Sequence, residues 1–149
     1  MILNRQKTVR VARRPLESFL GRVQIELGID DAGLTICLVS DAEIARMNEA
    51  YRRKKGPTDV LSFPAVAKRK RARPRHARNA GESGDYLGDI AISPSAARRN
   101  ARHYRRTLPG ELRVLILHGV LHLLGYDHET DRGEMNRIER KLRGRFGLA

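Results

Sequence analysis

The chain has 149 residues, a 40% share of apolar side chains and a formal net charge of +13 at pH 7. Its length suits one domain with a modest core, and it contains neither an apolar run long enough to cross a bilayer nor an N-terminal secretory signal, so we expect a cytoplasmic protein. The excess of Lys and Arg favours a polyanionic partner such as nucleic acid, although a genome-wide bias toward arginine would produce the same excess.

The first forty residues predict a strand, a helix and a second strand. Residues 4–12 alternate weakly between polar and apolar side chains and are predicted as a strand. A helix follows, opened by Pro15 and stopped by Gly28. Its apolar face is expected to hold Leu16, Phe19, Leu20, Val23 and Leu27. Residues 34–40 are largely apolar, which is typical of an interior strand, and Cys37 within them is expected to be a small buried side chain.

The middle of the chain predicts a capped helix, an edge strand and a loop. Ser40 and Glu43 have the spacing of a capping box. The inner face of the helix that they begin is expected to hold Ile44, Met47 and Tyr51. Residues 57–64 are bounded by prolines, which indicates a strand at the edge of a sheet. The segment at about 65–84 has no apolar periodicity and is predicted to be a loop.

The second half predicts one strand and three helices. Residues 85–93 are predicted as a strand, and the Ser93-Pro94 pair that ends it is typical of a helix start. Pro109 opens a further helix that ends at Gly125, and the last helix is predicted to begin near Asp131. The last helix is expected to bury Met135, Ile138, Leu142 and Phe146. Strands mixed with helices in this way predict an α/β or α+β domain.

The most informative segment is HGVLHLLGYDH at residues 118–128. On a helix, His118 and His122 lie one turn apart on one face, with about 5–6 Å between their Cβ atoms. Gly125 can turn the chain sharply and bring His128 back toward the pair. Three imidazoles around one ion leave a fourth position for water, as in catalytic zinc sites. We therefore expect these three histidines to bind one metal ion, with zinc as the default and nickel or another transition metal as alternatives.

A purely structural role is the competing interpretation of these histidines. One imidazole on an apolar helix is usually a hydrogen-bonded core residue, but burying several of them without a shared partner is costly. The spacing also resembles the metzincin protease pattern H-E-x-x-H-x-x-G-x-x-H, in which the Glu is the general base of peptide hydrolysis. Gly119 stands at the position of that Glu. Its presence argues against a peptidase of this design and keeps the metal-binding geometry.

Residues 118–128 resemble the signature of the YbeY family of bacterial endoribonucleases, H-G-x-L-H-L-x-G-Y-D-H, at every fixed position. Residues 51–64 and 87–93 are similar to two further blocks of the family, in the same order. The resemblance implies a single domain over residues 1–149, with a mixed sheet of about four strands flanked by helices. It also implies a zinc-dependent endoribonuclease of single-stranded RNA that acts in 16S rRNA 3′-end maturation and ribosome quality control, with the 30S and 70S ribosome as partners.

The same resemblance makes Arg52 the active-site arginine, whereas the sequence alone does not choose it over Arg53 or Lys54. A cationic fork beside the metal stabilises the charge that an RNA phosphodiester gains in its transition state. Either metal-bound water or the RNA 2′-hydroxyl can be the attacking group. Asp127 is the carboxylate nearest to the histidines. It is interpreted as a residue that orients a histidine, as a general base, or as a turn-forming aspartate.

Residues 68–78, within the predicted loop, are rich in Lys and Arg and contain no acid. They either grip the RNA backbone or form a solvated insertion. The candidate RNA-binding residues are Lys68, Arg69, Lys70, Arg71, Arg73 and Arg75. Two other functions remain open for the whole chain, a metallopeptidase-like hydrolase and a non-catalytic basic ribosome-assembly factor with a structural metal.

Overall fold

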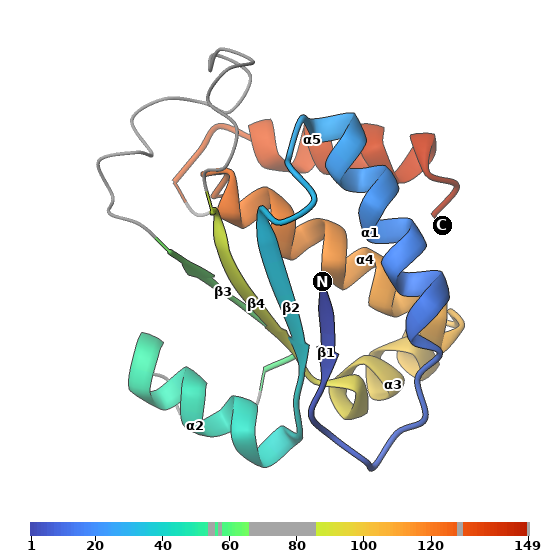
Figure 1. The fold of residues 1–149 in the computed structure, drawn as a ribbon, viewed down its shortest axis with the longest axis vertical. Helices are drawn as coiled ribbons and strands as arrows, with labels where there is room; N and C mark the ends of the chain where they lie inside the picture. The colour runs from blue at the N-terminus through green and yellow to red at the C-terminus, as the bar shows by residue number, and fades with distance from the viewer. Residues whose placement is uncertain (54–55, 57, 66–85, 128–129, 149) are drawn as a thin grey trace.

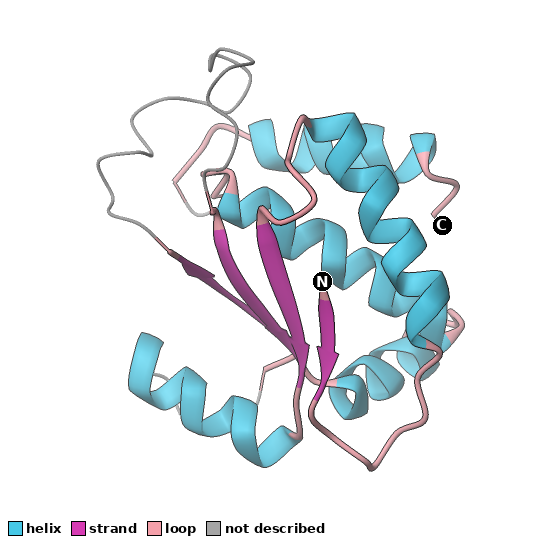
Figure 2. Cartoon of the chain, viewed as in Figure 1, coloured by secondary structure: helices cyan, strands magenta, loops and turns pink. Residues whose placement is uncertain are grey.

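The computed structural model describes residues 1–53, 56, 58–65, 86–127 and 130–148, which form a layered α/β fold (Figures 1 and 2). Over these residues there are five helices and one four-stranded sheet. In chain order the elements are β1 (Ile2–Asn4), α1 (Arg13–Leu27), β2 (Leu34–Leu38), α2 (Asp41–Arg52), β3 (Val60–Pro64), β4 (Gly88–Ile92), α3 (Pro94–His103), α4 (Leu108–Leu123) and α5 (Glu134–Arg145). None of the helices in these ranges is long and apolar enough to cross a membrane.

The sheet is mixed, which confirms the predicted fold class. Its strand order is β1-β2-β4-β3, with β1, β2 and β4 parallel and β3 antiparallel to β4. The inner positions of β2 and β4 explain why their sequences are largely apolar. β3 lies at the edge of the sheet, as the flanking prolines indicated. Proline cannot donate to the hydrogen-bond ladder, and an edge strand tolerates such residues.

The two faces of the sheet are covered unequally (Figure 1). The main core lies on the face covered by α1 and α4, and α3 and α5 pack against α4. Helix α4 is apolar nearly all round, so it can bury one side against the sheet and the other against helices. Its central residues Ile116, Leu117, Val120 and Leu121 are 0% exposed. Of the described elements, only α2 lies on the opposite face, through a small cluster that contains Ile44.

The first predicted strand is wrong in its position. β1 covers Ile2–Asn4, and residues 5–12 are not a strand. The reason is the length of β2, which ends at Leu38, the residue that already pairs with Asn4, so a longer β1 would have no partner strand. Beyond β1 the buried side chain of Gln6 holds the chain in a turn, because it donates from Nε2 to the carbonyl of Val9 at 2.9 Å and accepts from the Val9 amide at 2.9 Å.

Most helix boundaries lie within two residues of the predicted signals, although α1 begins at Arg13, before Pro15, and α4 ends at Leu123, before Gly125. Gly28 ends α1 in the left-handed conformation at φ 69°, and Ser93 caps α3 by accepting from the Ala96 amide at 3.1 Å. Helix α5 begins at Glu134, beyond the predicted start at Asp131. The Asp131 carboxylate accepts the amides of Gly133 and Met135 at 2.8 Å each, so this residue precedes the helix and binds its first donors.

Several side chains are less buried than predicted, since Leu27, Met47, Ile138 and Phe146 are only half-buried. Cys37 in β2 is half-buried, because its side chain lies on the thinly covered face of the sheet, and partial burial raises the pKa of its thiol. Tyr51 is 53% exposed rather than on the inner face of α2. In that helix Asn48 is buried instead, and its amide donates to the carbonyl of Gly56 at 3.0 Å.

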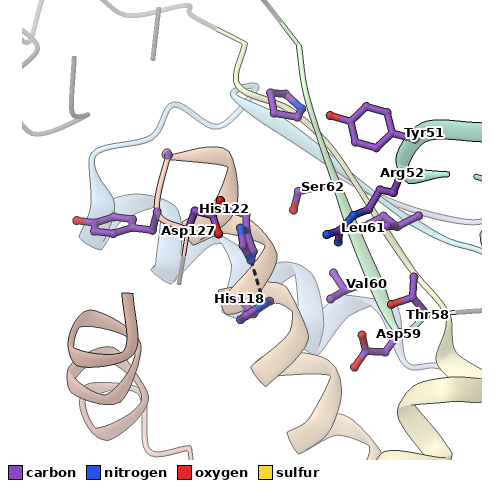
Figure 3. A pocket seen from close by; sticks show the side chains of 13 residues that line it. Tyr51, Arg52, Thr58, Asp59, Val60, Leu61, Ser62, His118, His122 and Asp127 are labelled. Carbon is purple, nitrogen blue, oxygen red and sulfur yellow. Dashed lines mark hydrogen bonds between the residues drawn. The ribbon is translucent and has the colours of Figure 1, made fainter. Parts of the chain in front are cut away.

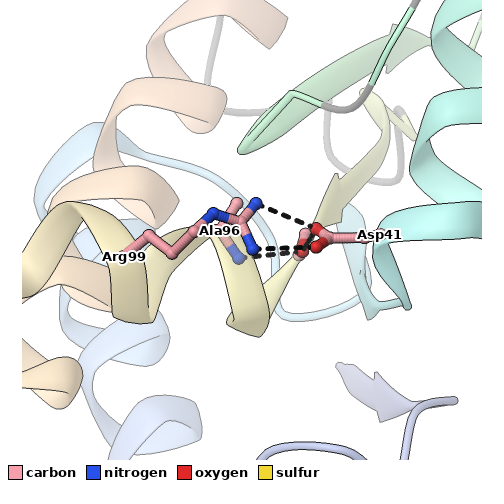
Figure 4. A network of polar contacts seen from close by, with 4 residues as sticks. Asp41, Ala96 and Arg99 are labelled. Carbon is pink, nitrogen blue, oxygen red and sulfur yellow. Dashed lines mark hydrogen bonds and ion pairs between the residues drawn. The ribbon is translucent and has the colours of Figure 1, made fainter.

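The N-terminal end of α2 is fixed to α3 by polar contacts (Figure 4). The Asp41 carboxylate accepts from the Ser93 hydroxyl at 2.6 Å and from the Arg99 guanidinium at 2.9 Å. These hydrogen bonds, led by the one from Arg99, lower the pKa of Asp41 below its ordinary value. The same helix therefore has an anchored first turn and an exposed last turn.

Candidate active site

A pocket of about 400 Å³ opens between the last turn of α2, the edge strand β3 and the C-terminal end of α4 (Figure 3). Helix α4, which is distant in the sequence, meets α2 and β3 there, because β3 packs against α4 while α2 covers the other side of the strand. The lining residues are Tyr51, Arg52, Thr58, Asp59, Val60, Leu61, Ser62, Pro64, His118, His122, Gly125, Tyr126 and Asp127.

His118 and His122 converge on this pocket from the last two turns of α4. Their Nε2 atoms lie 3.1 Å apart and their ring centroids 4.6 Å apart. Two nitrogens that bind one tetrahedral zinc ion at about 2.0–2.1 Å lie about 3.3 Å from each other. The spacing of the pair therefore fits two adjacent corners of a metal coordination sphere.

The third predicted ligand, His128, lies outside the described residues. Within the described ranges, no cluster of three or more His, Cys, Asp or Glu side chains suited to a metal ion is present. The three-histidine site stays a prediction, of which the structure places two members side by side.

Glu139 in α5 fixes the orientation of His118, and the sequence analysis did not identify it. Its Oε1 atom lies 2.8 Å from Nδ1 of His118, and the two side chains are 17% and 26% exposed. A carboxylate at Nδ1 holds the ring hydrogen on that nitrogen, so Nε2 keeps its lone pair toward His122. One signal was available: Glu139 occupies the same helical stripe as the buried Met135 and Leu142, where an unpaired carboxylate would be costly.

The close approach of α4 to the sheet explains Gly119. A Cβ atom built at this position would lie 2.8 Å from the buried side chain of Ile90 in β4. On the neighbouring strand, the hydroxyl of Ser62 donates to the carbonyl of Gly119 at 3.0 Å. Position 119 therefore faces the sheet, and the general-base glutamate of a metzincin has no room here.

Arg52 is the last residue of α2 and reaches into the pocket from the side opposite the histidines. Figure 3 shows its guanidinium directed toward the histidine pair. Arg53 ends the helix in a left-handed conformation at φ 57° and does not line the pocket. Lys54 lies outside the described residues. Of the two described candidates, the fold therefore brings only Arg52 to the pocket.

Two aspartates also line the pocket. Asp127 is half-buried and lines the pocket beside the histidines. Its backbone carbonyl accepts hydrogen bonds from the amides of Thr130 and Asp131, as is typical of a turn. Asp59 was not singled out from the sequence. Its Oδ2 atom accepts from the Asn100 amide at 3.0 Å, which holds the carboxylate in place at the start of β3. The predicted RNA-binding residues of the loop, from Lys68 to Arg75, fall outside the described residues.

Comparison with known proteins gives consistent results. Residues 1–147 match the family described as Endoribonuclease YbeY. A protein named Endoribonuclease YbeY from Solibacter usitatus (strain Ellin6076) is 42% identical over 137 residues, which is 91% of this chain and 81% of that protein. One of the same name from Koribacter versatilis (strain Ellin345) is 39% identical over 148 residues, 99% of this chain and 86% of that protein.

A solved structure has the same kind of fold. The solution structure of TM1509 from Thermotoga maritima superposes with a TM-score of 0.59 at 29% sequence identity. The match covers 95% of this chain and 85% of that one. The likeness therefore extends over the sheet and the helices on both of its faces, including the elements that form the pocket.

Proposed function

The chain belongs to the YbeY endoribonuclease family, and from this premise we propose that it is a zinc-dependent endoribonuclease that cuts single-stranded RNA in the pocket between α2, β3 and α4. The observation that carries the proposal is the convergence of the His118 and His122 Nε2 atoms at 3.1 Å in a pocket that Arg52 also lines. Imidazole pairs suit zinc, and other transition metals are the alternatives.

His118, His122 and His128 would hold the ion. When bound, the metal supplies a Lewis acid for a phosphate oxygen and lowers the pKa of a bound water toward about 7. Glu139 keeps the Nδ1 hydrogen of His118 in place, so that the Nε2 lone pair stays directed at the ion. The helix supplies the remaining rigidity, because α4 is buried on both sides.

Arg52 acts on the phosphodiester. Its guanidinium donates to the non-bridging oxygens and stabilises the negative charge that grows as the phosphorus is attacked. Asp127 either orients a histidine or takes the proton of the attacking group, which is water or the 2′-hydroxyl of the RNA. Neither attacking group requires the general-base glutamate that a metzincin carries at the position of Gly119.

The biological substrate that we propose is the 3′ end of 16S rRNA, with the 30S and 70S ribosome as partners in maturation and quality control in the cytoplasm. Support comes from the family membership and from the formal charge of +13, which favours binding to a polyanion. The metallopeptidase alternative is disfavoured by the contact that excludes a side chain at Gly119. The remaining alternative is an assembly factor in which the metal only stabilises the fold.

One experiment separates the three functions. The purified protein is incubated with labelled single-stranded RNA and with casein, each with and without a chelator, and its metal content is measured by elemental analysis. We expect cleavage of RNA alone, dependent on bound metal. Cleavage of casein without cleavage of RNA would overturn the proposal.

A variant pair tests the role of the metal. His122→Ala should remain folded, lose metal and lose RNA cleavage by about a thousandfold or more. The matched control is His103→Ala, because His103 is an exposed histidine of α3 outside the pocket. Full cleavage by folded His122→Ala contradicts metal catalysis, whereas unfolding of this variant alone supports a metal that only stabilises the fold.

A further inference from the structure

Tyr51 has no part in the chemistry proposed above, yet it forms one wall of the same pocket. Over the described residues the exposed tyrosines are Tyr51, Tyr86 and Tyr104, and of these only Tyr51 lines the pocket. It precedes Arg52, at the exposed end of α2. An aromatic ring that is 53% exposed is unusual for a helix position whose spacing predicts burial, so its surroundings need an explanation.

The ring is held in place although it is exposed. Tyr51 meets Phe63 of β3 in a T-shaped contact, with 4.6 Å between ring centroids and 65° between ring planes. Phe63 itself packs against the cluster that joins α2 to the sheet. The contact fixes the orientation of the Tyr51 ring and leaves about half of its surface open. A ring that is already ordered loses little conformational entropy when a flat ligand stacks on it.

The other two exposed tyrosines are engaged differently. The hydroxyl of Tyr86 donates to the carboxylate of Asp89 and accepts from the hydroxyl of Thr35 on the sheet. The ring of Tyr104 makes an edge-to-face contact with His103 and lies against the guanidinium of Arg106. Within the described chain, the Tyr51 hydroxyl makes no hydrogen bond. Its only described partner is the Phe63 ring, so its open surface is available to a ligand.

We propose that Tyr51 is a base-stacking subsite, on which an unpaired nucleobase next to the phosphate held by Arg52 packs. The inference rests on the proposed function for the placement of that phosphate. Every base has a π face, so stacking tolerates any sequence but requires a base that is not already stacked in a duplex. Tyr51 would thereby select single strands, and the adjacent arginine would hold the backbone of the same strand.

Binding to defined oligonucleotides tests the subsite separately from turnover. The probe is a short, fluorescently labelled single-stranded oligonucleotide with a 2′-O-methyl backbone, studied intact and with one abasic position moved along it. For the wild-type protein, we expect one abasic position to weaken binding about tenfold. Tyr51→Leu should weaken binding of the intact oligonucleotide by about the same factor, and it should no longer respond to that abasic position.

Two control variants separate stacking from general effects. Tyr104→Leu removes a tyrosine of similar exposure (58%) outside the pocket and should leave the affinity unchanged. Tyr51→Phe keeps the ring and should retain most of the affinity, and thermal unfolding verifies that each variant is folded. Equal sensitivity of wild type and Tyr51→Leu to every abasic position would overturn the subsite.

The outcomes also separate the subsite from the proposed function. Loss of the abasic effect in Tyr51→Leu, with no RNA cleavage by the wild type, would support the subsite and refute the nuclease activity. Cleavage of RNA by the wild type without any such coupling would refute the subsite alone. A wild-type protein that neither binds these oligonucleotides nor cleaves RNA would refute both.

Discussion

Helices α2 and α4 both supply the pocket, but the protein holds them in different ways. α4 runs through the main core, and its central residues are fully buried between the sheet and the other helices. α2 is the one described helix on the opposite face of the sheet, where Ile44 is its fully buried apolar side chain and Asp41 binds its first turn to α3. Its last two residues, Tyr51 and Arg52, are exposed.

This difference matches two different tasks in the proposed function. Converging imidazole nitrogens must be positioned to within about 0.5 Å, which a buried helix can provide. A flexible polymer such as RNA arrives from solvent, and the groups that meet it can lie at the exposed end of a peripheral helix. Changes at the buried faces of α4 should therefore damage the fold, whereas changes at the exposed end of α2 should damage RNA binding or turnover and leave the fold intact.

The largest effect is expected from Gly119→Glu, which tests the rigid half of the comparison. The substitution forces a side chain against Ile90 and places a charge in the core, so we expect a loss of about 3–5 kcal/mol of unfolding free energy. Urea denaturation measures it. The matched control is Gly144→Glu on α5, where an added Cβ meets nothing within 4 Å and stability should change by less than about 0.5 kcal/mol. Equal stability of Gly119→Glu and wild type would show that α4 can move away from β4.

Arg52→Glu tests the peripheral half. We expect the turnover of single-stranded RNA to fall by about 10²–10³-fold, because the stabilisation of the transition-state charge is lost, with unchanged metal content and thermal stability. The control is Arg46→Glu, which makes the same charge change at an exposed position of α2 outside the pocket. If both variants lose the same turnover, the effect is one of overall charge and the assignment of Arg52 is wrong.

The same contrast explains how much of the molecule the sequence predicted. The pair His118 and His122 was found because residues one helical turn apart are neighbours whatever the rest of the chain does. The exposure of Tyr51 was missed because helical spacing places it on the same face as Ile44 and Met47, which was predicted to be the inner face. That spacing cannot reveal that α2 extends past its small cluster and that Asn48 takes the buried position.

Other features depend on contacts between distant segments. Glu139 meets His118 across 21 residues of sequence, and only the packing of α5 on α4 brings them together. β1 is shorter than predicted because β2, with which it pairs, ends at Leu38 opposite Asn4. Patterns of apolar residues predicted most of the helices and strands. They do not reveal polar side chains that bind backbone or other polar groups far away in the sequence.

Glu139→Gln tests α4 at a single contact, the one between Glu139 and Nδ1 of His118. Because the amide can still accept a hydrogen bond but carries no charge, we expect the affinity of the proposed site for zinc to fall by about tenfold, and by up to a hundredfold for Glu139→Ala. Competition with a chromophoric chelator measures the affinity directly, independently of RNA cleavage. Glu26→Gln is the control, since Glu26 pairs with Arg145 outside the pocket. Unchanged zinc affinity in both Glu139 variants would mean that the contact with His118 only packs α5 against α4.

The smallest effect concerns the anchored end of α2. Arg99→Ala removes the partner that contributes most to the lowered pKa of Asp41, and because both side chains are partly exposed, we expect a loss of less than about 1 kcal/mol. Since the folded pKa of Asp41 lies below its unfolded value of about 3.9, the stabilisation is present above that pH and disappears as the pH falls through the folded pKa. The difference between Arg99→Ala and wild type in urea midpoint should therefore shrink on acidification. The control is Arg98→Ala, since Arg98 is exposed and has no ion pair in the described part of the chain, and this variant should show no such pH dependence. A constant difference between Arg99→Ala and wild type across this pH range would mean that the ion pair does not anchor α2.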